Sequence, residues 1–541
     1  MKLSTKGRYG LKAMVDLTVA YGRGYVSIAT LAQQQGISES YLEQLIASLK
    51  KAGLVESVRG AQGGYALSRK PEDIDVGEVL RALEGSTSIM GCVDVNGASC
   101  DNACSCSARP LWLKLQKRID EVLDTTTLAD MAEDYKTQLR RFNSAQERKT
   151  DMRRVYMDNA ATTSLAPEVL EQMMPYLTNI YGNPSSVHSF GREAKAGVDK
   201  ARQQLAKALN AELDEIIFTG CGTESDNTVL LGVAERYKSK GNHIITTNIE
   251  HHAILHTCEY LEKHGCEVTY LPVDENGMVT AEQVKNAIRD NTVLVSVMFA
   301  NNEVGTIMPI AEIGKVCKEK GVFFHTDAVQ AVGHVPIDVK AMNIDMLSLS
   351  AHKFHGPKGV GALYVRRGIR LPSHIMGGAQ ERGRRAGTEN TAGIVGLGAA
   401  IELACSNMEE NARRMTALRN RLMEGIEREI PYVKLNGHRT ERLPNNVNYS
   451  IKFIEGESIL LMLDMNGIAA SSGSACTSGS LDPSHVLLAL GLPHEIAHGS
   501  VRLTLGDDTT EEDVDYVIDV LKKTAERLRA MSPLYKGQIN R

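Results

Sequence analysis

Short apolar runs alternate with longer amphipathic segments through most of the chain beyond residue 155. The runs have the length of buried strands, and helical periodicity separates most of them. They are Ile216–Thr219, His243–Thr246, Glu267–Leu271, Val293–Phe299, Val322–His325, Met346–Ser350 and Gly361–Val365. This alternation predicts an α/β fold built on a largely parallel sheet.

The first seventy residues show a different pattern, in which helical periodicity comes first. Residues 7–21 place Leu11, Met14, Val15 and Val19 on one helix face. A second helix ends near Gly36, and Ser38 is a suitable N-cap for a third helix over residues 39–51. Two short strands around a Gly-rich turn follow, within residues 54–67. The order predicts a winged helix-turn-helix, a mostly α-helical DNA-binding fold.

Between these parts lie one more amphipathic helix and a segment without periodicity. Residues 111–123 carry Leu and Ile at intervals of three and four, as a long helix requires. Residues 136–154 are charged and poor in apolar side chains, which is typical of a linker. We therefore expect a multidomain chain with a regulator-like domain over 1–135, a linker over 136–154 and an α/β domain over 155–530.

Composition agrees with a soluble globular protein, since 43% of the 541 residues are hydrophobic and 23% are charged. The N-terminus does not resemble a signal peptide, and no apolar stretch is long enough to span a membrane, so a cytoplasmic protein is expected. Residues 1–70 carry ten Lys/Arg against four Asp/Glu, although the whole chain has a net charge of −5. A basic block suggests an anionic partner such as DNA, and a solvated charged face is the alternative.

The strongest candidate for chemistry is a Lys that follows a predicted strand. Lys353 comes directly after the apolar run 344–350 and precedes a Gly/Pro turn. A Lys amine held at a strand end can form a Schiff base with an aldehyde. Upstream, Asp327 follows the apolar run 322–324 and could pair with a pyridinium nitrogen. Either residue alone is ambiguous, because a Lys after a strand is usually a surface residue.

With these residues in view, the chain from Val155 to about Leu528 resembles a cysteine desulfurase of the NifS/IscS type, in the fold type I family of pyridoxal-phosphate enzymes. The matching stretches occur in the family's order, at Met157–Thr163, Gly182–Ser186 and Ser471–Cys476. The resemblance implies a large and a small domain, pyridoxal 5'-phosphate as cofactor, and L-cysteine as substrate.

The resemblance also implies roles for individual residues. His252 would stack on the cofactor ring and shuttle protons, and Lys353 would bind the aldehyde. The substrate would contact Asn183 and Arg502. Other cofactor contacts would come from Gly222, Thr223, Asn302, Asp327, Gln330, Ser350, His352 and, from the other subunit, Thr388.

Cys476 decides which chemistry the domain performs. It stands in the small-residue loop 471–480, where little can bury it, so we expect an exposed, mobile thiol. By resemblance its thiolate takes the sulfur of cysteine as a persulfide, releases alanine, and passes the sulfur to an iron-sulfur scaffold or another acceptor. A different activity of the same family, such as selenocysteine lyase, would keep Lys353 and Asp327 but change the substrate.

Residues 1–135 resemble the iron-sulfur-sensing winged-helix regulators of the IscR type, on the stretches Leu3–Tyr9, Val58–Gly60 and Gly63–Tyr65. Four thiols lie close together in this part, and spacing alone leaves zinc and an iron-sulfur cluster open. The resemblance favours a [2Fe-2S] cluster. Arg109 occupies the position of the family's usual His ligand, which leaves the fourth ligand uncertain. The candidate ligands are Cys92, Cys100, Cys104 and Cys106.

The predicted contacts to DNA come from the third helix and the wing. Ser38, Glu43 and Gln44 would face base edges, Tyr41 would contact the sugar-phosphate backbone, and Arg59 would reach a minor groove. The sequence thus predicts a homodimeric desulfurase fused to an iron-sulfur-responsive transcriptional regulator. The alternative is primarily a transcription factor, whose desulfurase half serves as sensor or cluster loader.

Overall fold

The computed structural model describes residues 4–58, 63–90, 93, 106–138, 153–472 and 483–535. The chain divides into two compact units, Met1–Asp151 and Met152–Arg541. Five residues with predicted roles lie outside the described residues: Arg59, Cys92, Cys100, Cys104 and Cys476.

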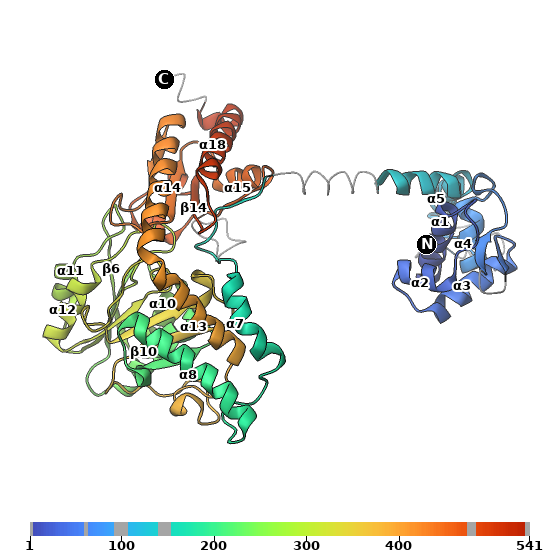
Figure 1. Ribbon diagram of the computed structural model, residues 1–541. Coiled ribbons are helices and arrows are strands. Elements are labelled where there is room, and N and C mark those ends of the chain that lie inside the picture. Colours follow the sequence, from blue (N-terminus) through green and yellow to red (C-terminus); the bar gives the residue numbers. More distant parts are fainter. Residues whose placement is uncertain are drawn as a thin grey trace. The chain divides into compact units, whose positions relative to one another are not determined.

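The N-terminal unit begins with three helices, α1 (Thr5–Val19), α2 (Ile28–Gln35) and α3 (Glu39–Lys51). Gly36 ends α2 in the left-handed conformation, with φ of 65°, and Ser38 caps α3 by accepting a hydrogen bond from the Tyr41 N–H. An antiparallel hairpin follows, then two further helices: β1 (Val55–Val58), β2 (Gly64–Leu67), α4 (Val76–Glu84) and α5 (Arg109–Thr125). The three helices, the hairpin and α5 stand in the predicted order, whereas α4 was not predicted (Figure 1).

Helix α5 leaves its apolar face uncovered. Among the described residues, Gln116 is the one residue of α5 that is buried, and its side chain accepts a hydrogen bond from the Ile89 N–H at 2.8 Å. Four apolar side chains of the helix are between 41% and 62% exposed, namely Leu111, Leu113, Leu115 and Val122. The helix is therefore attached to its unit by a polar side chain, and its leucines face away from that unit's core.

The C-terminal unit is built on a sheet with seven strands in the described chain, in the order β4-β10-β9-β8-β7-β5-β6. The strands are β4 (Ile216–Thr219), β5 (His243–Thr247), β6 (Glu267–Leu271), β7 (Thr292–Ser296), β8 (Phe323–Asp327), β9 (Met346–Ser350) and β10 (Gly361–Val365). All neighbours pair in parallel except β10, which is antiparallel to both β4 and β9. The largely parallel sheet is confirmed.

Helices cover both faces of this sheet, as buried parallel strands require. One face packs mainly against α7 (Pro167–Thr178), α8 (Ser189–Leu209), α12 (Ile310–Lys320) and α13 (Thr391–Ser406). The other face packs against α9 (Gly222–Arg236) and α10 (His252–Lys263). Side chains on this second face include a polar row at its centre, with Ser296, His325 and Ser348 all fully buried.

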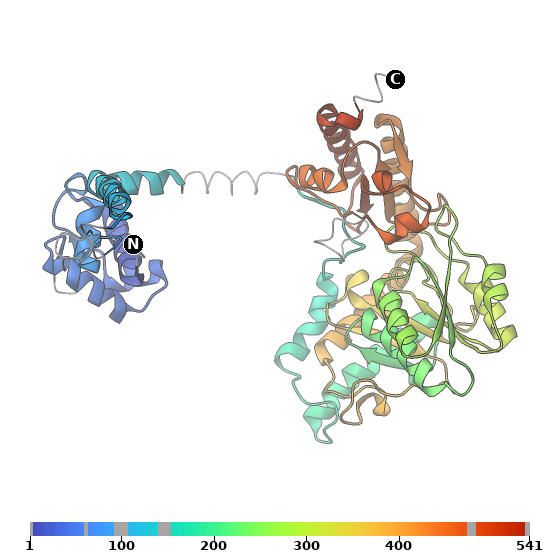
Figure 2. The same ribbon diagram turned by 180° about the vertical axis from the view of Figure 1, so that it is seen from behind.

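A smaller domain with its own core completes the unit. Its antiparallel sheet has the order β11-β12-β14, with β11 (Val433–Leu435), β12 (Asn446–Ile451) and β14 (Ser500–Thr504). Helices α14 (Met408–Glu429) and α18 (Glu511–Met531) lie side by side in both ribbon views (Figures 1 and 2). The remaining elements are α11 (Ala281–Ala287), α15 (Gly456–Asp464), α16 (His485–Ala489), α17 (His494–Ala497) and the parallel pair β3 (Val155–Tyr156) and β13 (Ile468–Ala469).

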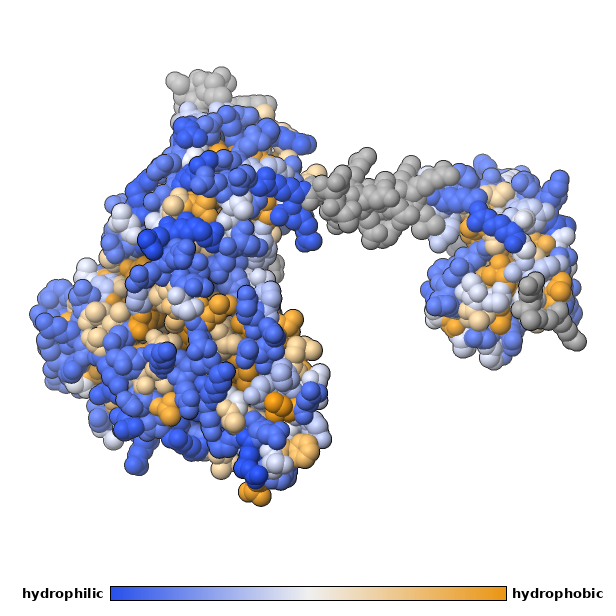
Figure 3. All heavy atoms as spheres, in the orientation of Figure 1, coloured by the Kyte–Doolittle hydropathy of each residue, from blue (hydrophilic) through white to orange (hydrophobic). Residues whose placement is uncertain are grey.

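The surface in view is mostly hydrophilic with scattered apolar residues (Figure 3). No single helix in the described ranges is long and apolar enough to cross a membrane, and only the bent pair α13 and α14 reaches that length and composition together.

Candidate active site

A cavity of about 320 Å³ lies between the carboxyl ends of strands β4, β8 and β9 and the smaller domain, which contributes Arg502 of β14. This is the position at which open α/β sheets bind ligands. Its lining comes from segments far apart in the sequence: Ala160, Ala161, Cys221, Gly222, Thr223, Asp226, His251, Met298, Ala300, Asn302, Asp327, Val329, Gln330, Ser350, His352, Lys353 and Arg502.

Lys353 reaches this cavity from a short 3-10 turn that follows β9 directly. Its Nζ donates hydrogen bonds to the Ala160 carbonyl at 2.6 Å and the Ala161 carbonyl at 2.8 Å. Both acceptors lie in the loop that follows β3. The amine is therefore held in one place by main-chain oxygens, as the sequence predicts for a Schiff-base Lys at a strand end.

Asp327 is the last residue of β8 and lines the same cavity. One carboxylate oxygen accepts a hydrogen bond from the Val329 N–H at 2.9 Å. Burial raises the pKa of Asp327, while His251, that hydrogen bond and Lys353 act in the opposite direction. The carboxyl is thus placed to meet a cation inside the cavity.

The first turn of α9 forms a cradle on the cavity wall. Cys221 is the N-cap and its side chain makes no capping hydrogen bond, so main-chain N–H groups of this turn are open to a ligand. A Cβ at Gly222 would come within 2.6 Å of the Val329 side chain, so only Gly fits here. Ser350 and His352 line the same cavity. Burial is the main cause that lowers the pKa of His352 to about 4.

This arrangement fits pyridoxal phosphate. A helix N-terminus of 15-residue α9 with Gly222 and Thr223 suits a phosphate group, and Asp327 and Lys353 are placed for a ring nitrogen and an aldehyde. Gln330 donates a hydrogen bond from Nε2 to the Ala160 carbonyl at 2.9 Å, so it tethers the same loop that receives Lys353.

Arg502 of β14 is buried at the cavity edge, with 2% of its side chain exposed. Its Nη1 donates to the Asn302 carbonyl at 2.9 Å, and its Nη2 pairs with Asp158 at 3.0 Å. Its Nε has no hydrogen-bond partner within the described chain. A buried guanidinium with an unused N–H that faces a cavity is suited to bind a carboxylate.

The prediction for His252 requires a correction, because the neighbouring His251 lines the cavity instead. His251 is the N-cap of α10, and its Nδ1 accepts a hydrogen bond from the Ala253 N–H at 3.1 Å. His252 is the first helical residue and turns away, with its ring 4.8 Å from the rings of His256 and His485. Of the two neighbours, His251 is therefore the one placed to contact a ligand in the cavity.

Two other predicted residues do not line this cavity within the described chain. Asn183 is exposed and its side chain accepts a hydrogen bond from the Ser185 N–H at 2.9 Å. Thr388 is also exposed, in the segment before α13. Cys476 lies outside the described residues, but Ser471 before it is bonded through main-chain groups to Arg502, so the loop that holds Cys476 starts at the cavity edge.

Sequence reasoning missed two buried carboxyls next to the cavity. Asp226 of α9 is 1% exposed and lines it, and Glu250 before α10 is fully buried. Burial raises the pKa of both, for Glu250 to about 8. Their positions in the sequence could have indicated that they lie near the cavity, because Glu250 follows a predicted strand and Asp226 follows the Gly-rich turn.

In the N-terminal unit, Glu43 and Gln44 are exposed on α3, where DNA contacts were predicted. Ser38 uses its hydroxyl as the helix cap, and Tyr41 packs edge-on against Tyr9 with ring centres 6.4 Å apart. Of the predicted cluster ligands only Cys106 is described, and it is exposed. Within the described residues no group of three His, Cys, Asp or Glu is arranged for a metal ion.

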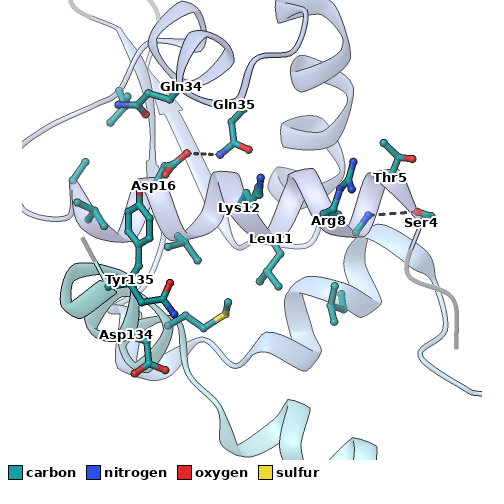
Figure 4. A pocket seen from close by; sticks show the side chains of 18 of the residues that line it. Ser4, Thr5, Arg8, Leu11, Lys12, Asp16, Gln34, Gln35, Asp134 and Tyr135 are labelled. Carbon is teal, nitrogen blue, oxygen red and sulfur yellow. Dashed lines mark hydrogen bonds between the residues drawn. The ribbon is translucent and has the colours of Figure 1, made fainter. Parts of the chain in front are cut away.

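A groove of about 1110 Å³ runs along α1 in this unit. Figure 4 shows Arg8, Leu11 and Lys12 of α1 in it, together with Asp134 and Tyr135 from the unit's last helical segment. The Gln35 side chain donates a hydrogen bond to Asp16 at its rim. The groove and the apolar face of α5 are two uncovered surfaces of this unit.

Comparison with known proteins gives two family matches. Residues 155–517 match the model of aminotransferase class-V, and residues 3–134 match the Rrf2 family, described as iron-dependent transcriptional regulator. Over 386 residues the chain is 63% identical to the cysteine desulfurase IscS of Clostridium botulinum, covering 71% of this chain and 97% of that protein. The IscS of Methanosarcina thermophila is 58% identical, covering 71% and 95%.

Solved structures give the same result for the C-terminal unit. A NifS-like protein aligns with a TM-score of 0.65 at 42% identity, covering 70% of this chain and 99% of that one. The apo structure of a cysteine desulfurase from Thermococcus onnurineus aligns with a TM-score of 0.63 at 27% identity, covering 71% and 96%.

Proposed function

Because this chain belongs to the class-V aminotransferase family and carries an Rrf2-family regulator in residues 3–134, we propose that it supplies sulfur for iron-sulfur cluster assembly and regulates transcription in response to such clusters. Its C-terminal unit is a pyridoxal-phosphate-dependent cysteine desulfurase. The observation that carries this function is the cavity in which Lys353, Asp327 and the α9 cradle converge.

Most of the cavity residues have a task in this function. Bound pyridoxal phosphate would supply an electron sink that labilises bonds to the α-carbon of the amino acid. Lys353 would hold its aldehyde carbon, Asp327 its ring nitrogen, and Gly222 and Thr223 its phosphate. Asn302 and Gln330 would border the ring, Ser350 and His352 would complete the phosphate side, and Arg502 would take the substrate carboxylate.

His251 lines the cavity, and its Nδ1 is engaged in the cap of α10. Since Nδ1 accepts the Ala253 N–H, a neutral His251 carries its proton on Nε2. His251 is therefore suited to stack on the ring and to donate a proton at Nε2. Protonation at Nδ1 would break the cap of α10.

Cys476 is the proposed sulfur acceptor within the enzyme. Its thiolate attacks the substrate sulfur, a sulfur–sulfur bond forms, and the substrate's carbon–sulfur bond breaks. Alanine leaves with the electron pair taken up as a C–H bond, and the persulfide stays on Cys476. A scaffold protein or other acceptor thiol then takes the outer sulfur.

The test is alanine release from L-cysteine with dithiothreitol, compared with L-selenocysteine. We expect Cys476→Ala to lose sulfide production but to keep the visible absorbance of bound cofactor, and Lys353→Ala to lose both. Cys405→Ser, a half-buried thiol on α13, is the matched control and should retain full activity. Full sulfide production by the Cys476→Ala protein would refute the assigned nucleophile, and a strong preference for selenocysteine would favour the lyase activity.

For the N-terminal unit we propose a winged helix that binds promoter DNA. The supporting geometry is the capped helix α3, with Glu43 and Gln44 exposed, followed by the β1–β2 hairpin whose turn contains Arg59. Cys92, Cys100, Cys104 and Cys106 are the proposed ligands of a [2Fe-2S] cluster. Iron, sulfide and zinc analysis of protein purified without oxygen tests the cluster, and promoter binding at low salt by holo and apo protein tests the regulator.

We also propose that the protein is a homodimer that uses the exposed leucines of α5. A helix with this apolar face requires a partner surface, and a second α5 provides a matching one. Sedimentation of the full chain tests the dimer. A monomer at micromolar concentration would refute it.

A further inference from the structure

The cofactor cavity and its surroundings contain more buried carboxyl groups than the proposed function uses. Asp226, Glu250 and Asp327 are all buried, and electrostatic interaction between them contributes to raising the pKa of both Asp226 and Glu250. Only Asp327 has a task, that of meeting the ring nitrogen. The question is therefore what Asp226 does on the cavity wall.

Asp226 and Asp327 line the same buried cavity, and their charges interact. The Asp226 Oδ1 atom is 3.7 Å from Nε2 of His325, which lies two residues before Asp327 on the same face of β8. Ser348, which hydrogen-bonds to the Asp226 side chain, is the register partner of Asp327 on β9. Two buried carboxylates that share a cavity repel each other when both are ionised, which favours a proton on one of them.

The surroundings decide which one is neutral. Asp327 accepts the Val329 N–H and faces Lys353 and His251, all of which favour its anion. Among the causes that shift the pKa of Asp226 no cation appears, and the nearby His325 bonds to Ser296 through Nδ1 and to Ser348 through Nε2. Burial lowers the pKa of His325 to about 3, so this ring supplies no positive charge.

The Asp226 Oδ1 atom also lacks a hydrogen-bond partner in the described chain, and its distance of 3.7 Å to His325 Nε2 is too long for a hydrogen bond. A buried carboxylate oxygen without a donor is costly, whereas a neutral acid is far less so. The titratable or charged groups around it come from five segments: Asp327 and His325 of β8, Glu250 and His251 before α10, Cys221 at the start of α9, Lys353 after β9, and Arg502 of β14.

We propose that Asp226 is a positioning residue which, as a neutral carboxylic acid beside Asp327, leaves a single anion in the cavity lining to face the ring nitrogen. The proposal rests on the proposed function for the cofactor, but the protonation of Asp226 is a property of the protein alone. The neutral acid keeps Asp327 ionised without placing a second negative charge next to the bound phosphate.

The experiment compares wild type with Asp226→Asn, since an amide has the shape and charge of a protonated acid. With pyridoxal phosphate bound, we expect the pH midpoint of the visible absorbance band in Asp226→Asn to stay within about 0.3 pH units of wild type. Asp327→Asn, which removes the anion, is the contrasting variant and should shift the midpoint by about one pH unit or more, or lose the band. A comparable shift in Asp226→Asn would overturn the proposal.

A second measurement needs no cofactor. The infrared difference spectrum of wild-type apoprotein minus Asp226→Asn at pH 7 should contain the C=O stretch of a protonated acid. A carboxylate band in its place would show that Asp226 is ionised and would refute the proposal, even if the variant cannot bind cofactor. If wild type shows no visible band at all, the cofactor assignment fails, and the infrared result still decides the state of Asp226.

Discussion

Glu250 gives the prediction with the clearest magnitude. Its Oε1 accepts hydrogen bonds from the Thr247 hydroxyl at 2.8 Å and the Met298 N–H at 2.9 Å, and its Oε2 has no partner within the described chain. Burial is the main cause that raises the pKa from 4.5 to about 8. Ionising this carboxyl in the folded protein therefore costs about 5 kcal/mol more than in the unfolded chain.

The direction in which stability changes with pH follows from the difference in proton affinity between the folded and unfolded protein. Because the folded protein binds this proton more tightly, the stabilisation is fully present below pH 4.5 and is lost as pH rises toward 8. The loss at pH 7 is about 3 kcal/mol and levels off near 5 kcal/mol above pH 8. Glu250→Gln cannot lose a proton, so the difference in unfolding free energy between the two proteins should change by about 4 kcal/mol between pH 5 and pH 9.

The assay is urea unfolding of the apoprotein at intervals of pH, followed by circular dichroism. Trp112, the single Trp of the chain, lies in α5, so its fluorescence follows the unfolding of the N-terminal unit, which serves as an internal control. The unfolding transition seen by this fluorescence should be unaffected by Glu250→Gln at every pH. The absolute stability of the variant is not diagnostic, since the new amide brings unpaired N–H groups. Parallel profiles from pH 5 to pH 9 would refute the reasoning.

Three further predictions concern binding. Gly222→Ala should weaken pyridoxal-phosphate affinity at least about tenfold because its Cβ meets the Val329 side chain, and Val329→Ala in the same chain should restore part of it, as measured by cofactor titration. Arg502→Lys should raise the KM for cysteine about 10- to 100-fold with a smaller effect on kcat, because Lys cannot bind a carboxylate bidentately. The double variant Leu115→Glu/Val122→Glu should weaken DNA binding at least about tenfold in a mobility-shift assay and leave alanine release unchanged. Both side chains belong to the exposed face of α5 that is proposed to form the dimer.

The strands of the large sheet could be predicted because buried parallel strands read as continuous apolar runs bounded by turn residues. Even so, the run predicted over 293–299 ends as strand β7 at Ser296. Beyond it, the Val297 and Phe299 N–H groups still bond to the carbonyls of His325 and Asp327, so apolar character continues after regular pairing ends. Lys353 and Asp327 were identifiable for the same reason, since each marks the end of such a run.

Choosing between His251 and His252 was beyond pattern reasoning. The two are adjacent, and successive positions on a helix differ by about 100° in direction. The outcome depends on which residue becomes the cap of α10, a property of the backbone after Glu250. Asp226 and Glu250 escaped notice because a carboxyl near a helix start ordinarily indicates a favourable solvated charge.

The charges around the cavity explain why the buried carboxyls of Asp226 and Glu250 are tolerated. The buried and half-buried carboxyls near the cavity include those of Asp158, Asp226, Glu250 and Asp327, and the described cavity lining carries the cations Lys353 and Arg502. If all four were ionised, the site would repel both a phosphate and a substrate carboxylate. Protons on Asp226 and Glu250 would leave two anions, each already matched by a cation: Asp158 with Arg502, and Asp327 with Lys353. A site balanced in this way can accept an anionic guest.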